Sequence, residues 1–115
     1  MNDQGMRLEF GVEKNRSRAK ISVVGEFDRL QVEHFDRVSA GLTRELREFV
    51  VDLRRTTIID SAALGSLVRL RHALDAVDCV MSVVVSMPFQ ETVMRVGGLF
   101  DYLGVEVESD SAAEP

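Results

Sequence analysis

The sequence contains a single cysteine, Cys79, and this excludes an internal disulfide and a zinc cluster built on several thiolates. Cys79 directly precedes an apolar run, so we expect a small buried residue rather than a reactive thiol. Neither His34 nor His72 stands in a recognisable Cys/His arrangement, which argues against thiol catalysis. One unpaired cysteine fits a reducing compartment, and we expect a cytoplasmic protein.

Long apolar runs are also missing. The longest ones are far too short to span a bilayer, and the opening ten residues lack the apolar core of a signal peptide. We therefore expect no direct insertion into a membrane.

Motifs for phosphate cradles and nucleophiles are absent as well. There is no G-x-x-x-x-G-K-[ST], no G-x-G-x-x-G, and no G-x-S-x-G around Ser61. A Ser-His-Asp triad would need His34 or His72, and His72 lies on the same predicted helix as Ser61, three turns downstream. No cluster of His, Cys and carboxylates predicts a metal site. We expect no catalytic residue, no metal and no cofactor in this chain.

A basic face of the kind that binds nucleic acid is lacking too. The formal net charge is −5, whereas nucleic-acid binding usually needs clustered positive charge. The basic residues stand in separate small groups, so we expect no nucleic-acid partner. These groups are Lys14, Arg16, Arg18 and Lys20, then Arg54 and Arg55, then Arg69 and Arg71.

The 115 residues, 45% hydrophobic and 29% charged, predict one globular domain with a real core. Residues 1–6 are polar, and residues 109–115 are small, acidic and without periodicity. We expect a flexible N-terminus over 1–6, a folded domain over 7–108 and a disordered acidic tail over 109–115.

Hydrophobic periodicity within the domain switches between the strand and helix types. Two alternating segments, Arg7–Val12 and Ala19–Val24, predict an antiparallel hairpin. A helical period follows over Leu30–Leu46, with Asp28 as a plausible N-cap. The β-branched run Phe49–Leu53 predicts a buried strand.

The second half repeats the alternation. After a predicted loop at Arg54–Thr57, the spacing predicts a helix over Ser61–Asp78. A strand at Val80–Ser86 follows, then a helix from Pro88 to Gly104, and a short final strand at Val105–Val107. Gly97-Gly98 marks a packing notch or a helix break inside that last helix. The expected fold is α/β: a mixed four- to five-stranded sheet with an N-terminal antiparallel hairpin and helices packed against it.

The chemistry centres on Asp60 and Ser61, where a loop beyond a strand passes into a helix. Asp60 is the better cap by position, which leaves the Ser61 side chain free to point outward. A helix N-terminus favours an anion, so the fold would tolerate a phosphate on Ser61. The alternative is that Ser61 serves the helix start alone, as a cap.

Three pieces of the sequence together resemble the STAS domain of anti-sigma factor antagonists. They are ISVVGEFD at Ile21–Asp28, FVVDL at Phe49–Leu53 and IDSAALGSL at Ile59–Leu67. They occur in the family's order and spacing, and the resemblance extends from about Arg7 to Val107.

The resemblance implies a partner-switching regulator. The unphosphorylated form of such a protein binds an anti-sigma factor serine kinase and releases a sigma factor. Phosphorylation ends that binding, and a phosphatase restores it. Ser61 stands at the phosphoacceptor position, and ATP and Mg²⁺ would belong to the kinase. The chain itself would be a monomer or a weak dimer. The implied partner-binding residues are Asp28, Asp60, Ser61, Ala62, Leu64 and Gly65.

Two departures from the family pattern affect the site. Ala62-Ala63 stands where the family often has Ser-Gly, which removes an alternative acceptor and stiffens the helix start. Arg54 and Arg55 occupy a loop often filled by small residues. They are either solvated or, with Thr57, contacts for a partner or for a phosphate on Ser61.

Two other functions stay open at this stage. One is a non-switching STAS module in a lipid-transport ABC complex or a stress-signalling assembly, which would use the helix face after Ser61 without phosphate turnover. The other is a sensor of a small ligand or nucleotide.

Overall fold

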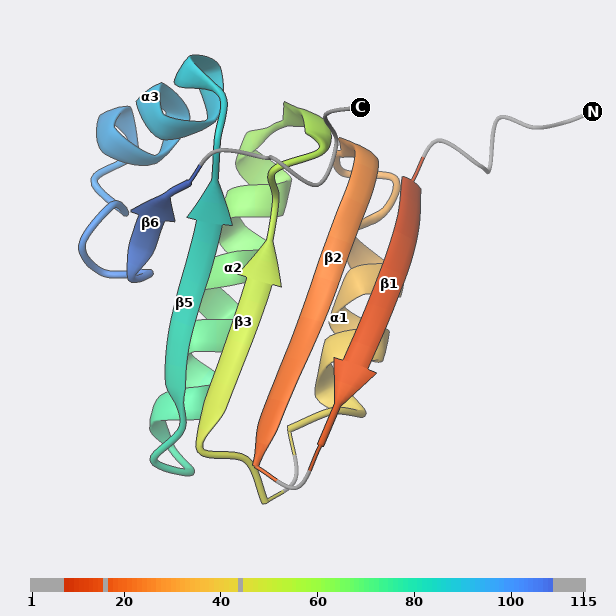
Figure 1. Ribbon diagram of the computed structural model, residues 1–115. Helices are drawn as coiled ribbons and strands as arrows, with labels where there is room; N and C mark the ends of the chain where they lie inside the picture. Colours follow the sequence, from red (N-terminus) through yellow and green to blue (C-terminus); the bar gives the residue numbers. More distant parts are fainter. Residues whose placement is uncertain (1–7, 16, 44, 109–115) are drawn as a thin grey trace, which may run out of the picture.

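The structure is a computed structural model that describes residues 8–15, 17–43 and 45–108. These residues form six strands and three helices, and each helix lies between two strands along the chain (Figure 1). The predicted N-terminal extension, with Arg7, and the predicted acidic tail lie outside the described residues. The elements are β1 (Leu8–Lys14), β2 (Arg18–Phe27), α1 (Val32–Ala40), β3 (Glu48–Asp52), β4 (Thr56–Ile59), α2 (Ser61–Asp75), β5 (Val80–Val85), α3 (Pro88–Val96) and β6 (Val105–Val107).

The strands form one mixed sheet in the order β1-β2-β3-β5-β6, with β4 paired to β2 off this path. The β1–β2 pair is antiparallel, and all other pairs are parallel. The predicted hairpin and parallel crossovers are therefore confirmed, since helices carry the chain between the parallel strands.

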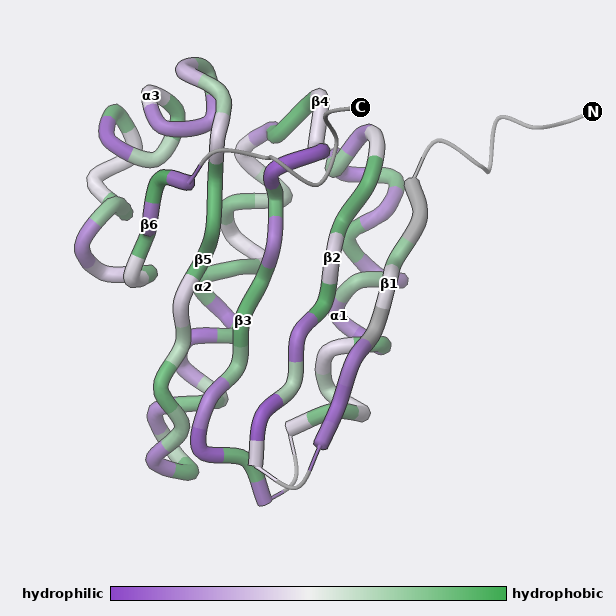
Figure 2. The backbone as a smooth tube through the Cα atoms, viewed as in Figure 1, coloured by the Kyte–Doolittle hydropathy of each residue, from purple (hydrophilic) through white to green (hydrophobic). Residues whose placement is uncertain are grey.

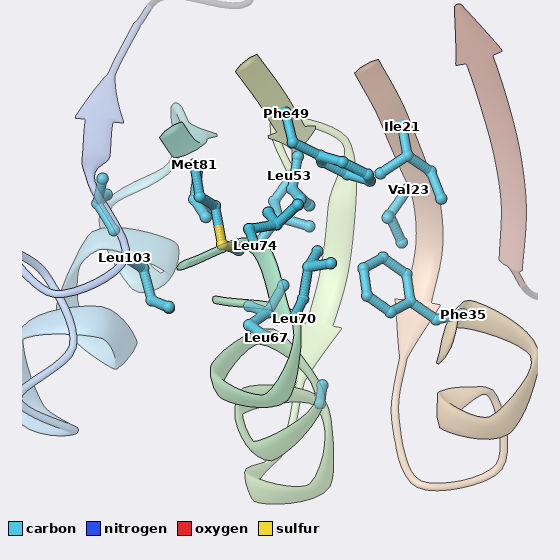
Figure 3. Packing of buried hydrophobic residues seen from close by; sticks show 14 of the residues in the cluster. Ile21, Val23, Phe35, Phe49, Leu53, Leu67, Leu70, Leu74, Met81 and Leu103 are labelled. Atoms are coloured by element: carbon cyan, nitrogen blue, oxygen red, sulfur yellow. The ribbon is translucent and has the colours of Figure 1, made fainter. Parts of the chain in front are cut away.

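Helices α1 and α2 lie together against one face of the sheet (Figure 1). Residues of β2 alternate between buried and half-buried over Ala19–Val23, so every second side chain enters the core. Strand β5 is hydrophobic along most of its length (Figure 2). In the core, Phe35 of α1 points toward Val23 of β2, and Leu67, Leu70 and Leu74 of α2 lie next to one another in the same cluster (Figure 3).

The sheet has one strand more than the sequence predicted. Arg54–Thr57 was expected to be a loop, but Thr56–Ile59 forms β4. The reason is the length of β2: β3 pairs with its first half, up to Ser22, and β4 pairs with its second half, from Gly25. Thr56 anchors the new strand, since its hydroxyl donates a 2.6 Å hydrogen bond to the carbonyl of Val23.

The first helix is shorter than its hydrophobic period indicated. It begins at Val32 and ends at Ala40, whereas the prediction ran to Leu46. Asp28 is not its N-cap, and that prediction was wrong. The Asp28 carboxylate instead accepts the Leu30 N–H at 3.1 Å and so forms an Asx turn in the loop that precedes the helix.

The other two helices also end early. Helix α2 ends at Asp75, ahead of the predicted Asp78, whose backbone has a positive φ of 59°. Helix α3 ends at Val96 rather than at Gly104, because Gly97 closes it and Gly98 adopts φ 72°. Gly97-Gly98 is therefore a helix break, one of the two roles expected for it.

A buried amide joins α3 to the rest of the domain. The Oε1 atom of Gln90 accepts the N–H groups of Ser86 (2.8 Å) and Met87 (3.0 Å). Its Nε2 atom donates to the carbonyls of Leu53 (2.7 Å) and Thr56 (2.8 Å). Because Gln90 is fully buried and its donors and acceptor are used, this one side chain fixes the β3–β4 turn against the start of α3.

Candidate functional site

Ser61 is the first residue of α2, and its side chain is exposed. Asp60 caps the helix, since its Oδ1 atom accepts the Ala63 N–H at 2.9 Å. The Ser61 hydroxyl has no hydrogen-bond partner within the described part of the chain. The predicted cap at Asp60 is thus confirmed, and Ser61 does not cap the helix.

The second carboxylate oxygen of Asp60 reaches across to the loop between β2 and α1. Its Oδ2 atom accepts the Arg29 N–H at 2.9 Å, and the Asp60 N–H itself donates to the Phe27 carbonyl at 3.4 Å. One side chain therefore caps α2 and fastens the 28–31 loop beside Ser61.

This fastening creates an open depression next to the serine. It is lined by Asp28, Arg29, Leu30, Asp60, Ser61 and Ala62. Asp28, which the sequence analysis expected near Ser61, is placed there by the loop. Leu30 is 79% exposed, so a large apolar side chain stands beside a depression whose lining residues include two aspartates and one arginine.

The remaining predicted contact residues lie farther along α2. Ala62 is half-buried at the rim of the depression. Leu64 is also half-buried and packs against the core. A Cβ built on Gly97 would lie 3.7 Å from the Leu64 Cδ1 atom, so Leu64 joins α2 to the end of α3. Gly65 is half-buried, and a Cβ there would meet the Arg69 guanidinium at 3.5 Å. These residues all lie in the first two turns of α2, beginning at Ser61.

Arg54 and Arg55 are not brought to this depression. They line a different one, together with Lys20, Ser22, Val23, Val24 and Asp52. Arg54 forms a fork with Asp52: its Nε atom lies 3.0 Å from Oδ1, and its Nη2 atom lies 2.8 Å from Oδ2. The Arg55 carbonyl accepts the Gly25 N–H at 3.2 Å, which helps to fix β4 beside β2.

The charges around Asp52 have a consequence for its protonation. Burial by itself would raise the pKa of Asp52. The hydrogen bonds and charge of Arg54, with a further contribution from Lys20 whose Nζ atom lies 3.6 Å away, outweigh burial and lower the pKa. Asp52 and Arg54 thus form a charged pair at the end of β3.

Thr57 is exposed on β4, whereas its neighbour Thr56 is buried and bonded to Val23.

Cys79 is buried, and burial, followed by the nearby charge of Glu48, raises the pKa of its thiol. Across residues 8–15, 17–43 and 45–108, no three His, Cys, Asp or Glu side chains are grouped to hold a metal ion. No helix in the described ranges has the length and apolar character needed to cross a membrane.

Three residues of importance were missed by the sequence analysis. Arg29 and Leu30 follow the piece that ends at Asp28, and only the three-dimensional path of the loop brings them to Ser61. Gln90 has the sequence context of an ordinary polar residue in an amphipathic helix, and nothing in that context predicts that its side chain is buried.

The structure is similar to solved structures of known regulators. An anti-sigma factor antagonist from Mycobacterium paratuberculosis matches with a TM-score of 0.79 and 20% identity, over 91% of this chain and 90% of that one. The anti-sigma factor antagonist SpoIIAA in its unphosphorylated form matches with a TM-score of 0.76 and 20% identity, over 91% and 92%. The Bacillus cell fate determinant SpoIIAA in the phosphorylated form gives 0.70 and 19%, over 91% and 96%.

A comparison with curated proteins found no match. The family model described as "Mlab, STAS domain" matches residues 10–105, which is most of the chain. The fold shared with the solved antagonists agrees with this match, and the resemblance seen in the three sequence pieces is confirmed. The chain belongs to the STAS-domain family.

Proposed function

We propose that this protein is an anti-sigma factor antagonist whose binding is switched by phosphorylation of Ser61. In this proposal the unmodified chain binds an anti-sigma factor serine kinase and thereby releases a sigma factor. The proposal rests on one observation at the start of α2. The Asp60 carboxylate makes the capping bond and the bond to the 28–31 loop, whereas the Ser61 side chain is exposed and its hydroxyl makes no hydrogen bond to the described residues.

The geometry supports a modification that leaves the domain folded. A phosphoryl group on Ser61 would sit at a helix N-terminus, where the N–H groups and the dipole favour an anion. The two solved forms of SpoIIAA, unphosphorylated and phosphorylated, both share this chain's fold. This similarity supports a fold that accommodates the modification.

The same geometry supports a large effect on binding. A phosphate adds about −1.5 to −2 charge and three acceptor oxygens. Its position is the depression that already contains the carboxylates of Asp28 and Asp60. A partner that packs closely on Ser61, Leu30 and Ala62 would have to desolvate the phosphate or move away.

The partners follow from the proposed role. The kinase would supply ATP and Mg²⁺, a phosphatase would restore the serine, and the exchange would take place in the cytoplasm. The binding surface would comprise the depression beside Ser61 with Leu64 and Gly65 of α2.

The test uses the purified chain as bait in lysate of its own source cells. We expect the wild type and Ser61→Ala to capture an anti-sigma factor kinase, and Ser61→Asp to lose it. The captured kinase with ATP and Mg²⁺ should transfer one phosphate to the wild type, at Ser61 by mass spectrometry, and none to Ser61→Ala. Equal capture by Ser61→Asp, or phosphate on another residue, would refute the proposal.

A second candidate is a non-switching STAS module, for instance in a lipid-transport ABC complex. The observation in its favour is the description of the matching family model, which names Mlab and no sigma-factor regulator. In that case the captured partner would be a transport subunit, and Ser61 would carry no phosphate.

A further inference from the structure

Arg29 is the basic side chain at the depression beside Ser61. Arg29 and Ser61 line the same depression, and among the described residues that line it Arg29 is the only basic one. Its main-chain N–H is held by the Asp60 Oδ2 atom at 2.9 Å, so the backbone that carries the guanidinium is fixed to the start of α2. The side chain is exposed, and among the described residues it has no ion pair, hydrogen bond or ring contact.

Arg54 and Arg55, which follow β3, lie in a different depression from Ser61. Arg54 is forked onto Asp52 and, with Arg55, lines the separate depression that holds Lys20. The interpretation in which these two residues steady a phosphate on Ser61 therefore has no support in their placement. Arg29, on the 28–31 loop, is the arginine that lines the depression beside Ser61.

Charge balance makes such a cation useful. The residues that line the depression include two acidic side chains, Asp28 and Asp60, against one basic side chain, Arg29. A dianionic phosphoryl group would be repelled by both carboxylates at short range. A guanidinium matches phosphate geometry, since its N–H groups can donate two parallel charge-assisted hydrogen bonds.

We infer that Arg29 is the positioning residue for the phosphorylated state: its guanidinium pairs with the phosphoryl group on Ser61. The inference rests on the proposed function, because it assumes that Ser61 is the modified residue. The pair fixes the phosphate over the depression, where a docking partner would meet it. Arg29 thus acts on the modified form only, and the unmodified chain folds without its guanidinium.

The test installs phosphoserine at position 61 during synthesis, so that no kinase is needed. The phosphate pKa is then followed by ³¹P NMR in low salt, where charge pairs are least screened. A neighbouring guanidinium stabilises the dianion and lowers this pKa. We expect Arg29→Gln to raise it by roughly 0.5 units or more, and Arg29→Lys to give a value between those of wild type and Arg29→Gln.

Arg37→Gln is the matched control, because it removes the same charge from an exposed arginine of α1 that faces Glu33 at 3.8 Å. It should leave the phosphate pKa unchanged. An equal rise in Arg29→Gln and Arg37→Gln, or no rise in Arg29→Gln, would overturn the inference. Failure of a kinase to modify the chain would instead refute the proposed function and leave the pair between Arg29 and an installed phosphoserine intact.

Discussion

The carboxylate of Asp60 holds the main-chain N–H of Arg29 at 2.9 Å with one oxygen, while its other oxygen caps α2 at Ala63. The loop after β2 and the helix after β4 are far apart in sequence, and this single side chain joins them. Asp60 and Ser61 are adjacent in the chain but differ in role. The Asp60 carboxylate holds the loop and the helix together, whereas the Ser61 side chain is exposed beside them.

Replacing Asp60 with alanine should therefore destabilise the domain. Both N–H groups lose their acceptor, and the loss of an N-cap alone costs about 1 kcal/mol. We expect a total of about 1–3 kcal/mol in the free energy of unfolding, measured by urea denaturation. Ser61→Ala is the matched control and should stay within about 0.5 kcal/mol of wild type. A larger loss in Ser61→Ala than in Asp60→Ala would contradict the assignment.

Gln90→Leu should be more harmful than its conservative size suggests. Leucine is of similar size but removes the Gln90 partner of the Thr56 carbonyl and of the Ser86 and Met87 N–H groups. The Leu53 carbonyl loses the same partner and keeps the Thr56 N–H at 3.0 Å. We expect a loss of about 2–4 kcal/mol in the free energy of unfolding. Gln31→Leu is the control, because Gln31 precedes α1 and its side chain makes no capping bond. Equal stability of the two variants would show that the buried amide is dispensable.

Alanine substitutions at Gly104 and Gly98 separate the steric cost of an added Cβ atom from the cost of a positive φ. Both have positive φ, 65° and 72°, but a Cβ on Gly104 would lie 2.6 Å from the Met81 carbonyl oxygen, whereas one on Gly98 meets nothing within 4 Å. Gly98→Ala should cost about 1 kcal/mol, and Gly104→Ala clearly more. Thermal and urea unfolding of both variants measure the difference, and a similar cost for each would argue against close packing of Gly104 on β5.

The lowered pKa of Asp52 predicts a defined loss of stability in acid. Its folded pKa lies below the unfolded value near 3.8, so its contribution is fully present above that pH. The contribution disappears as the pH falls below that value through the folded pKa. Unfolding measured between about pH 6 and pH 3 should thus show a smaller pH dependence in Asp52→Asn than in wild type. Identical slopes would mean that the pair with Arg54 does not favour the charged form.

Much of the fold follows from the sequence because its hydrophobic periods are strong. The hairpin, the buried strands at Phe49 and Val80 and the cap at Asp60 were all predicted from local pattern. β4 was not, since Thr56 and Thr57 follow two arginines and become a strand only because β2 extends beyond β3. The helix ends were overestimated because apolar residues such as Leu42 and Leu46 continue the helical spacing after the backbone has left the helix.

The candidate site could be predicted only in part for a similar reason. Ser61, Asp60 and Asp28 belong to the pieces that resemble the family, and so they are predictable from the sequence. Arg29 and Leu30 have no such signal, and their importance depends on the hydrogen bond between Asp60 and the Arg29 main chain. Arg54 was predicted as a possible partner or phosphate contact because it is a charged loop residue. Its guanidinium instead pairs with Asp52, and the residue types alone do not predict this pairing.

The most direct test of the account compares one protein in two states. The affinity of the purified anti-sigma factor kinase is measured by calorimetry for the unmodified chain and for the chain with phosphoserine at position 61. The phosphate should weaken binding by about 100-fold or more, since a charged group must be desolvated or excluded at a close contact. Equal affinity of the two forms would contradict it.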